Sequence, residues 1–490
     1  MKKSIFILFT LISVSLAFGQ SDKDKVQETV TKSKIEGHIY FLADDLLKGR
    51  ETGTPENKIA ASYLANTLRS YGVRPNPKTG DYYQAVNLHR TSPPSDVMIS
   101  INNQTIKNYA IINAKSTDFA KGAVFLGYGL EKDYKGKSVD GKVVIVKAGS
   151  PETNDTRAAF GLLEQKRELA KQSGAVGVIE LLDAGTQIWG FIDHNFNTST
   201  LGISNEEDAK ADLPYVWVLD QGSKMANSLT SKTAIPIQFK MSDPKKEVIT
   251  SQNVIGIVEG TDPDLKNEYI IYSAHYDHVG IGTPDATGDT IYNGARDNAI
   301  GTTTVLSMAE NLAKYPTKRS ALFILFTGEE KGLLGSSFYV ENPVLPLKEM
   351  VYCFNSDNGG YNDTSLATII GLPRTTAQQH IKDAASAFGL TAIDDPAPEQ
   401  GLFDRSDNVN FAVKGIPAPT FSLGFTAFNG DVTKYYHRPG DEANTLDYDY
   451  LYKFFSAYVL AGRNIGNDPV TPTWTAGDKY EAAGKALYKN

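Results

Sequence analysis

The stretch EYIIYSAHYDHVG, residues 268–280, is an apolar run that stops at a cluster of imidazole and carboxylate groups. A second run of this kind, ALFILFTGEE at residues 321–330, ends in two glutamates. Short apolar runs rich in Ile, Phe and Tyr are typical of buried strands. Between them, NGARDN at 293–298 precedes a helical pattern over 298–315. Polar groups at the carboxyl ends of parallel strands gather in one crevice, so we expect one site built from these loops.

The composition is that of an ordinary globular protein with more than one domain. The chain has 490 residues, of which 41% are hydrophobic and 22% charged, and this length predicts two or three domains. Its 49 basic and 57 acidic residues form no long basic block. The sequence therefore argues against a nucleic-acid partner.

The first residues have the pattern of a signal peptide. Two lysines at positions 2 and 3 precede an apolar segment over 5–16, and Ala17-Phe18-Gly19 provides a small-x-small cleavage site. The apolar segment is too short to span a bilayer. We therefore expect export to the periplasm or the extracellular space, with no stable membrane span after cleavage.

A change in the sequence pattern along the chain divides it into parts. The stretch over 100–247 consists of short β runs separated by turns, with a single histidine, His194, and no cluster of catalytic type. From residue 253 the pattern becomes strand, loop, helix, strand, which predicts an α/β fold with a mixed, mostly parallel central sheet flanked by helices. The runs over 253–260 and 268–275 are expected to pair as a hairpin. The predicted parts are a signal peptide (1–19), the N-terminal part of a catalytic domain (20–99), an inserted β-rich domain (100–247), the catalytic domain proper (248–465), and a C-terminal linker with a short helix (466–490).

A metal site in this chain must use histidine and carboxylate ligands. Cys353 is the only cysteine and lies in an apolar run, so neither a disulfide nor a cysteine-rich site is possible. A two-metal site needs ligands for each ion, a bridging carboxylate, and a spare carboxylate to move a proton. The adjacent pair Glu329-Glu330 suits a division between ligand and base. The metal-capable groups, in chain order, are His275, Asp277, His278, Asp297, Glu329, Glu330, Asp357, His437 and Asp441.

Several separated motifs resemble the zinc-dependent aminopeptidase family called peptidase family M28. The early stretch over 38–68 resembles the N-terminal helices of that family, and GYGL, VDGKVVIVKAG and KQSGAVGVIEL in the insert are similar to a protease-associated domain. The resemblance implies the fold of zinc exopeptidases, described as phosphorylase/hydrolase-like. The motifs of the catalytic part are SAHYDHVG (273–280), NGARDNAIG (293–301), FTGEEKGLLGSSFYV (326–340), NSDNGG (355–360), RSDNVNFAVKGIPAPTF (405–421) and YYHRPGD (435–441).

The resemblance also implies two zinc ions per chain and a role for each site residue. In it, Glu329 is the general base, Asp277 orients His275, and the Asp297–Asn298 peptide bond is cis. The implied zinc ligands are His275 and Glu330 on one ion, Asp357 and His437 on the other, and Asp297 bridging both.

Other positions are expected to shape the substrate site. Tyr436 is expected to face the reacting carbonyl, and Arg405 to contact substrate. Arg296 stands where the family commonly has an acid, which would place a positive charge beside the site. His278 has no ligand role in the family pattern, so it is expected to be structural or to lie at the rim.

The implied activity is hydrolysis of peptide or protein substrates, with removal of N-terminal residues. Three alternatives stay open. A carboxypeptidase would need a basic pocket, for which Arg296, Arg374, Arg405 and Arg438 are candidates. A transferase like glutaminyl cyclase would hold a single zinc, and a receptor-like binding protein would have lost its ligands.

Overall fold

The computed structural model describes residues 20–153, 155–203, 213–232 and 235–489. The expected signal peptide lies outside these ranges. The chain forms two compact units, the first from residues up to Ala85 together with Ser251 onward, and the second from Val86–Thr250. The second unit begins earlier than the expected boundary at residue 100. In the described ranges, no helix has the length and apolar character that a membrane crossing requires.

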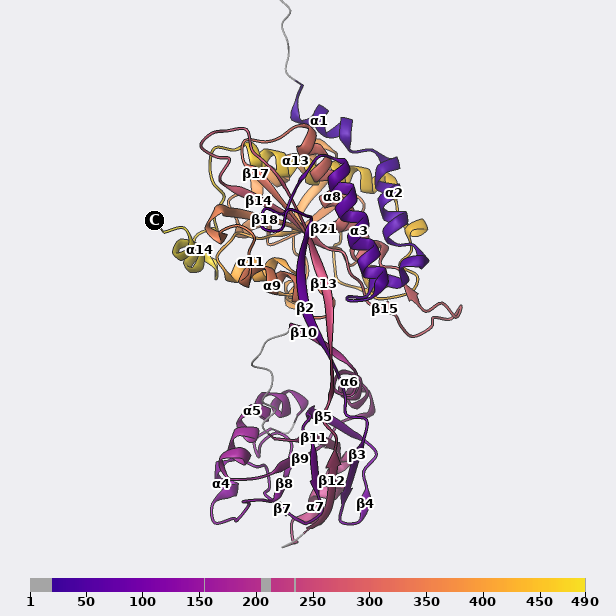
Figure 1. Ribbon diagram of the computed structural model, residues 1–490, viewed down its shortest axis with the longest axis vertical. Coiled ribbons are helices and arrows are strands. Elements are labelled where there is room, and N and C mark those ends of the chain that lie inside the picture. The colour runs from indigo at the N-terminus through magenta and orange to yellow at the C-terminus, as the bar shows by residue number, and fades with distance from the viewer. Residues whose placement is uncertain (1–19, 154, 204–212, 233–234, 490) are drawn as a thin grey trace, which may run out of the picture. The chain divides into compact units, whose positions relative to one another are not determined.

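A mixed ten-stranded sheet has its central strands in the first unit (Figure 1), whereas its residues 86–92, 200–203 and 245–250 fall in the second unit. Its centre is parallel, because β14 pairs in parallel with β17 and β18, and β18 with β21. In sheet order the strands are β10 (Thr200–Ile203), β2 (Tyr83–Ser92), β13 (Lys245–Val258), β17 (Ser320–Phe326), β14 (Tyr269–His275), β18 (Met350–Ser356), β21 (Thr420–Leu423), β19 (Leu366–Ile370) and β20 (Thr391–Asp394), with β1 (Arg74–Pro75) beside β13.

The predicted hairpin between the runs at 253–260 and 268–275 is wrong. β17 lies between β13 and β14, antiparallel to the first and parallel to the second. The parallel pairing sets His275 opposite Phe326, so both strands end at the same edge of the sheet. The polar residues that follow each strand are therefore neighbours.

Alternate residues of the central strands face two separate cores. On β14, Tyr272 belongs to one core and Ile271 to the other, as the two-residue period of a strand requires. The helices that contribute to the first core are α1 (Asp22–Thr29), α2 (Lys32–Leu42), α3 (Pro55–Ser70), α8 (Gly301–Lys314), α10 (Gln378–Ala387) and α13 (Tyr448–Asn467). On the second face lie α9 (Leu334–Glu341), α11 (Asn408–Val413) and α14 (Glu481–Leu487).

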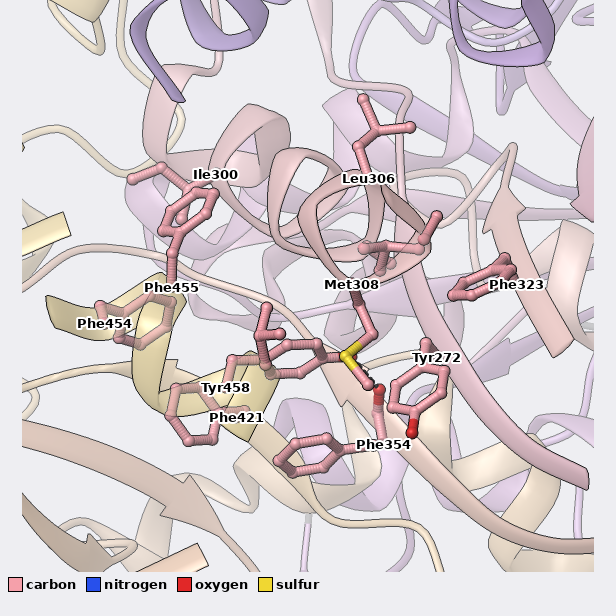
Figure 2. Close-up of a cluster of buried hydrophobic side chains, with 14 of the residues drawn as sticks. Tyr272, Ile300, Leu306, Met308, Phe323, Phe354, Phe421, Phe454, Phe455 and Tyr458 are labelled. Atoms are coloured by element: carbon pink, nitrogen blue, oxygen red, sulfur yellow. Dashed lines mark hydrogen bonds between the residues drawn. The ribbon is translucent and has the colours of Figure 1, made fainter. Parts of the chain in front are cut away.

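Aromatic side chains fill the first core, and Figure 2 shows Met308 of α8 reaching among their rings. The rings of Phe354 and Tyr458 stack with centroids 4.5 Å apart and planes 1° from parallel. A Cβ at Gly462 would lie 2.7 Å from the ring of Tyr272, so only glycine allows α13 this close to β14. Burial of each such side chain stabilises the fold by ~1.5–3 kcal/mol.

The second unit contains its own nine-stranded sheet with a core on each face. The sequence predicted its β character, but α6 was not foreseen. Its identity as a protease-associated domain remains a prediction. The strands are β3 (Val97–Ile101), β4 (Gln104–Thr105), β5 (Tyr109–Asn113), β6 (Thr117–Phe119), β7 (Gly122–Phe125), β8 (Val143–Lys147), β9 (Gly177–Leu182), β11 (Tyr215–Leu219) and β12 (Ile235–Met241), and the helices are α4 (Glu131–Tyr134), α5 (Thr156–Gln172), α6 (Thr186–Phe196) and α7 (Lys224–Leu229).

Candidate metal centre

Three parallel strands deliver most of the candidate ligands to one edge of the central sheet. His275 is the last residue of β14, the Glu329-Glu330 pair follows β17, and Asp357 follows β18. Asp297 lies in the turn that leads into α8, and its peptide bond to Asn298 is cis, as the resemblance implied. The expected site is thus assembled at the carboxyl ends of the strands.

His275 pairs with Asp357 rather than with Glu330. The His275 Nε2 atom lies 3.2 Å from Asp357 Oδ1 and 3.3 Å from Asp297 Oδ1. Asp357 follows the neighbouring strand β18, and Asp297 comes from the turn before α8. The expected pairing of His275 with Glu330 is therefore wrong, although both residues belong to the centre.

The second group forms around the other oxygen of Asp297. His437, in the loop after α12 (Gly430–Thr433), has its Nε2 atom 3.2 Å from Asp297 Oδ2 and 3.2 Å from Glu330 Oε2. His437 adopts φ +50°, in the left-handed region that few non-glycine residues occupy. The path of this loop brings His437 to the side of Glu330, which the order of residues in the sequence does not specify.

The spacing of these groups fits metal ions. Two ligands on a tetrahedral zinc ion, each about 2.0 Å from it, lie about 3.3 Å apart, and the four separations above are 3.2–3.3 Å. In addition, His437 Nε2 is buried without a hydrogen-bond partner in the part of the chain that the structure describes. Buried orphan groups of this kind mark the place of an ion or water. Asp297, with one oxygen toward each group, has the geometry of a bridging ligand.

The ionisable groups of the centre shift one another's pKa values. Burial opposes charging of His275, yet the nearby carboxylates of Glu329 and Asp357 raise its pKa well above the ordinary value. Burial likewise opposes the charged form of Asp297, but hydrogen bonds from His275 and His437 hold its pKa well below the usual range. The pKa of His437 is raised to about 10 against the effect of burial, by Asp297 and Glu330. Without a metal ion, the two histidines therefore hold protons, which a bound metal ion would displace.

Glu329 stands apart from the ligand pairs in its electrostatics. Burial raises the pKa of its carboxyl group well above the ordinary value, and the charge of Asp357 adds to the effect. Its side chain lines the pocket beside the metal groups. A carboxylate whose pKa is raised holds a proton more readily than an ordinary glutamate, as a general base requires.

Asp277 acts on His275 through its backbone and on Glu329 through its side chain. The carbonyl oxygen of Asp277 lies 3.2 Å from His275 Nδ1, whereas its carboxylate oxygen is 3.9 Å away. That carboxylate accepts from the backbone N–H of Glu329 at 3.2 Å and from Thr52 Oγ1 at 2.8 Å. The expected carboxylate contact with the histidine is therefore replaced by a carbonyl contact.

Arg50 joins the loops beneath the centre, a role that sequence reasoning missed. This fully buried arginine donates from Nε to Tyr276 O at 2.8 Å, from Nη1 to Asn293 O at 2.5 Å and to Leu42 O, and from Nη2 to Gly294 O at 3.0 Å. Two of these segments lead directly to His275 and Asp297. The position of Arg50 within the motif GRETGT (49–54) was the available signal.

Asp441 holds the Asp297 turn and is not one of the grouped ligands. Its carboxylate accepts from the backbone N–H groups of Arg296 at 2.9 Å and Asp297 at 3.2 Å. The guanidinium of Arg296 binds Asp441 at 2.9 Å and Thr445, and lies over the ring of Tyr435. Arg296 is buried there and does not line the pocket. Its expected positive charge beside the substrate is therefore neutralised by an ion pair.

A pocket opens directly beside the metal groups. Arg405 and Tyr436, both predicted to contact substrate, line it, and Tyr436 stacks on His437 with centroids 4.0 Å apart. Arg374 pairs with Asp478 instead, and Arg438 does not line the pocket. The apolar part of the lining consists of Ile370, Leu402, Phe425, Phe428 and Val432.

The part of the chain that carries this site is similar to known proteins. Residues 253–460 match peptidase family M28. Aminopeptidase YwaD of Bacillus subtilis is 32% identical over 209 residues, which cover 41% of this chain and 42% of that protein. The probable leucine aminopeptidase 2 of Aspergillus oryzae is 25% identical over 455 residues, covering 87% of this chain and 84% of that one. The solved structure of an aminopeptidase from Aneurinibacillus sp. strain AM-1 has the same fold, with a TM-score of 0.60 at 21% identity over 92% of this chain and 97% of that one.

The fold, the convergence of metal-ligating groups and the family match define the class of this protein: it is a metallopeptidase, a hydrolase of peptide bonds. Residues 253–460, which contain both groups of potential ligands, are the part that is similar to peptidase family M28.

Proposed function

We propose that the chain is an aminopeptidase with two zinc ions, which removes residues from the free N-termini of peptides. The observation that carries this proposal is the division of the ligands into two groups around the two oxygens of Asp297. One group adds His275 and Asp357, and the other adds Glu330 and His437. The relatives named as aminopeptidases support the same activity.

In the proposed mechanism the side chains have separate tasks. Zinc, when bound, acidifies water and polarises the scissile carbonyl. Glu329 accepts the proton of the attacking water as its oxygen bonds to the carbonyl carbon, and delivers that proton to the nitrogen as the C–N bond breaks. Asp277 holds the backbone of Glu329, so that the carboxylate keeps one direction. The products are a free carboxylate and a free amine.

The pocket supports a preference for apolar N-terminal residues. Its wall combines leucine, isoleucine, valine and phenylalanine side chains with the acidic groups of Glu329 and Asp357. A positively charged N-terminal amine is attracted to the acidic end, and an apolar side chain is buried against the wall. This arrangement is complementary to the first residue of a peptide such as one that begins with leucine.

A carboxypeptidase is the second candidate, because Arg405 lines the pocket and is exposed there. No side-chain hydrogen bond or ion pair of Arg405 is found with the described residues. A guanidinium in this position can bind a terminal carboxylate. The other arginines considered from the sequence do not line the pocket, so this alternative depends on Arg405 alone.

The second unit is proposed to be a protease-associated domain without chemistry of its own. Among the described residues, both groups of potential metal ligands come from the first unit. The expected arrangement of the chain, a catalytic domain interrupted by an insert, agrees with this proposal.

One set of substrates tests the proposed activity. Zinc-loaded protein should release p-nitroaniline from leucine p-nitroanilide and should cleave a peptide whose C-terminus is amidated. It should not cleave the same peptide when the N-terminus is acetylated, and Arg405→Ala should leave this pattern unchanged. Cleavage that requires a free C-terminus and is lost in Arg405→Ala would establish the carboxypeptidase instead. A single bound zinc with cyclisation of N-terminal glutamine would exclude both.

A further inference from the structure

His278 is a fully buried histidine that the proposed mechanism does not use. It follows β14 by three residues, and its relative exposure is 0%. Its Nδ1 atom lies 2.7 Å from Glu330 Oε1 and 4.0 Å from Asp297 Oδ2. Its ring packs edge-on against His437, with centroids 5.4 Å apart. A third imidazole therefore lies beside the second group of ligands.

Neither ring nitrogen of His278 makes a hydrogen bond of ordinary geometry to the described residues. A buried polar group without a partner is costly, and in native proteins it points to an ion, a water molecule or an interaction completed by a ligand. The ring packs closely against Gly294, where an added Cβ would lie 2.6 Å from it. The backbone of His278 is also held, by a bridge to Glu51.

The two oxygens of Glu330 face different partners. Oε2 lies 3.2 Å from His437 Nε2, at the separation of two ligands on one ion, while Oε1 faces His278. The 2.7 Å between His278 Nδ1 and Oε1 is the length of a hydrogen bond to a carboxylate. It is shorter than the ~3.3 Å between two ligands of one tetrahedral zinc ion. The distance of 4.0 Å from His278 Nδ1 to Asp297 Oδ2 is longer than this separation between two ligands.

We propose that His278 is a positioning residue of the metal centre: its Nδ1–H holds Glu330 Oε1, so that Oε2 stays directed toward the ion shared with His437. The inference rests on the proposed two-metal function and adds an asymmetry to it. Hydrogen bonds to a ligating carboxylate typically change metal affinity by ~10–100-fold. Loss of His278 should therefore weaken one metal position and leave the position at His275 and Asp357 unchanged.

The test compares zinc binding by three variants, measured as zinc per chain after dialysis against buffers of fixed free zinc. His278→Leu removes the donor, and His278→Asn places an amide N–H near the position of Nδ1. His38→Gln is the control, because His38 is a half-buried histidine of the same unit that contacts tyrosines rather than the centre. Wild-type protein and the control should bind two zinc ions with the same affinities.

In His278→Leu one zinc should bind as in wild type, and the second should need ~10–100-fold more free zinc. His278→Asn should recover part of that loss, and it also serves if the leucine variant does not fold. If both variants bound both zinc ions with wild-type affinity, the inference would be overturned. It would also be overturned if the affinity fell by the same factor at both metal positions. X-ray absorption that shows three imidazoles on zinc in the wild type would also overturn it, because His278 would then be a ligand. Wild-type protein with fewer than two zinc ions would instead refute the proposed function itself.

Discussion

The backbone N–H of Glu329 donates to the Oδ1 atom of Asp277 at 3.2 Å. This bond ties the residue proposed as general base to the loop after β14, and Thr52 Oγ1 holds the other carboxylate oxygen. His275, by contrast, contacts the backbone carbonyl of Asp277. The side chain of Asp277 therefore serves the base more than the metal ligand.

Asp277→Ala should lower kcat by ~10–100-fold while the protein keeps two zinc ions. The carbonyl that contacts His275 is still present in this variant, but the backbone of Glu329 loses its acceptor. Asp277→Asn, which retains an oxygen at that position, should lie much closer to wild type. The measurement is steady-state kinetics together with zinc per chain. Loss of zinc from Asp277→Ala would show that the carboxylate supports the ligand after all.

Glu329→Gln should keep both zinc ions and lose kcat by ~10²–10⁴-fold, because an amide cannot accept the proton. Substrate affinity should change little, since the side chain keeps its size and place in the pocket. Glu399→Gln, at an exposed position, is the matched control and should retain wild-type kinetics. Turnover of Glu329→Gln within a factor of a few of wild type would rule out the assignment of the base.

Arg50→Met should destabilise the first unit by more than about 3 kcal/mol, because it leaves several buried carbonyl groups without a donor. The loss should appear in denaturant unfolding of the metal-free protein, so that metal binding does not obscure it. Arg157→Met removes an exposed arginine and should have almost no effect. An Arg50→Met variant as stable as the control would mean that water replaces the guanidinium at no cost.

The acid stability of the first unit should depend on His38. Its ring nitrogens lie 2.8 Å from Tyr63 Oη and 3.0 Å from Tyr71 Oη, and burial lowers its pKa to about 4. In the unfolded chain a histidine has a pKa of about 6.5. The unfolded state therefore binds a proton first as pH falls, so stability is full above pH 6.5 and is lost progressively toward pH 4.

His38→Gln should flatten this pH dependence, because glutamine does not titrate. The measurement is the free energy of unfolding of the metal-free protein at several values between pH 4 and pH 7. His194→Gln, which changes an exposed histidine of the second unit, should keep the wild-type slope. An unchanged slope in His38→Gln would assign the acid sensitivity to other groups.

The sequence predicted those features that depend on local pattern. The apolar runs before His275 and Glu329 are strands, and the helical pattern over 298–315 corresponds to α8. The edge of the sheet where the site lies followed from the general behaviour of parallel strands. The cis bond at Asp297–Asn298 followed from the family resemblance.

Features that depend on long-range arrangement were not predictable in the same way. A hairpin between β13 and β14 satisfied every local rule, but β17, which comes later in the chain, pairs with both strands. The pairing of His437 with Glu330 depends on the direction of a loop more than a hundred residues away. The partners of Arg296 and Arg50 are backbone and side-chain groups from distant segments, and residue type alone does not reveal them.

In the proposed centre, Asp297 joins two zinc positions with different partners. This arrangement is tested most directly by anomalous X-ray scattering at the zinc edge from crystals of the zinc-loaded protein. We expect two peaks on opposite sides of the Asp297 carboxylate, one against His275 and Asp357 and the other against Glu330 and His437. A single peak, or two peaks with His275 and Glu330 on the same ion, would contradict it.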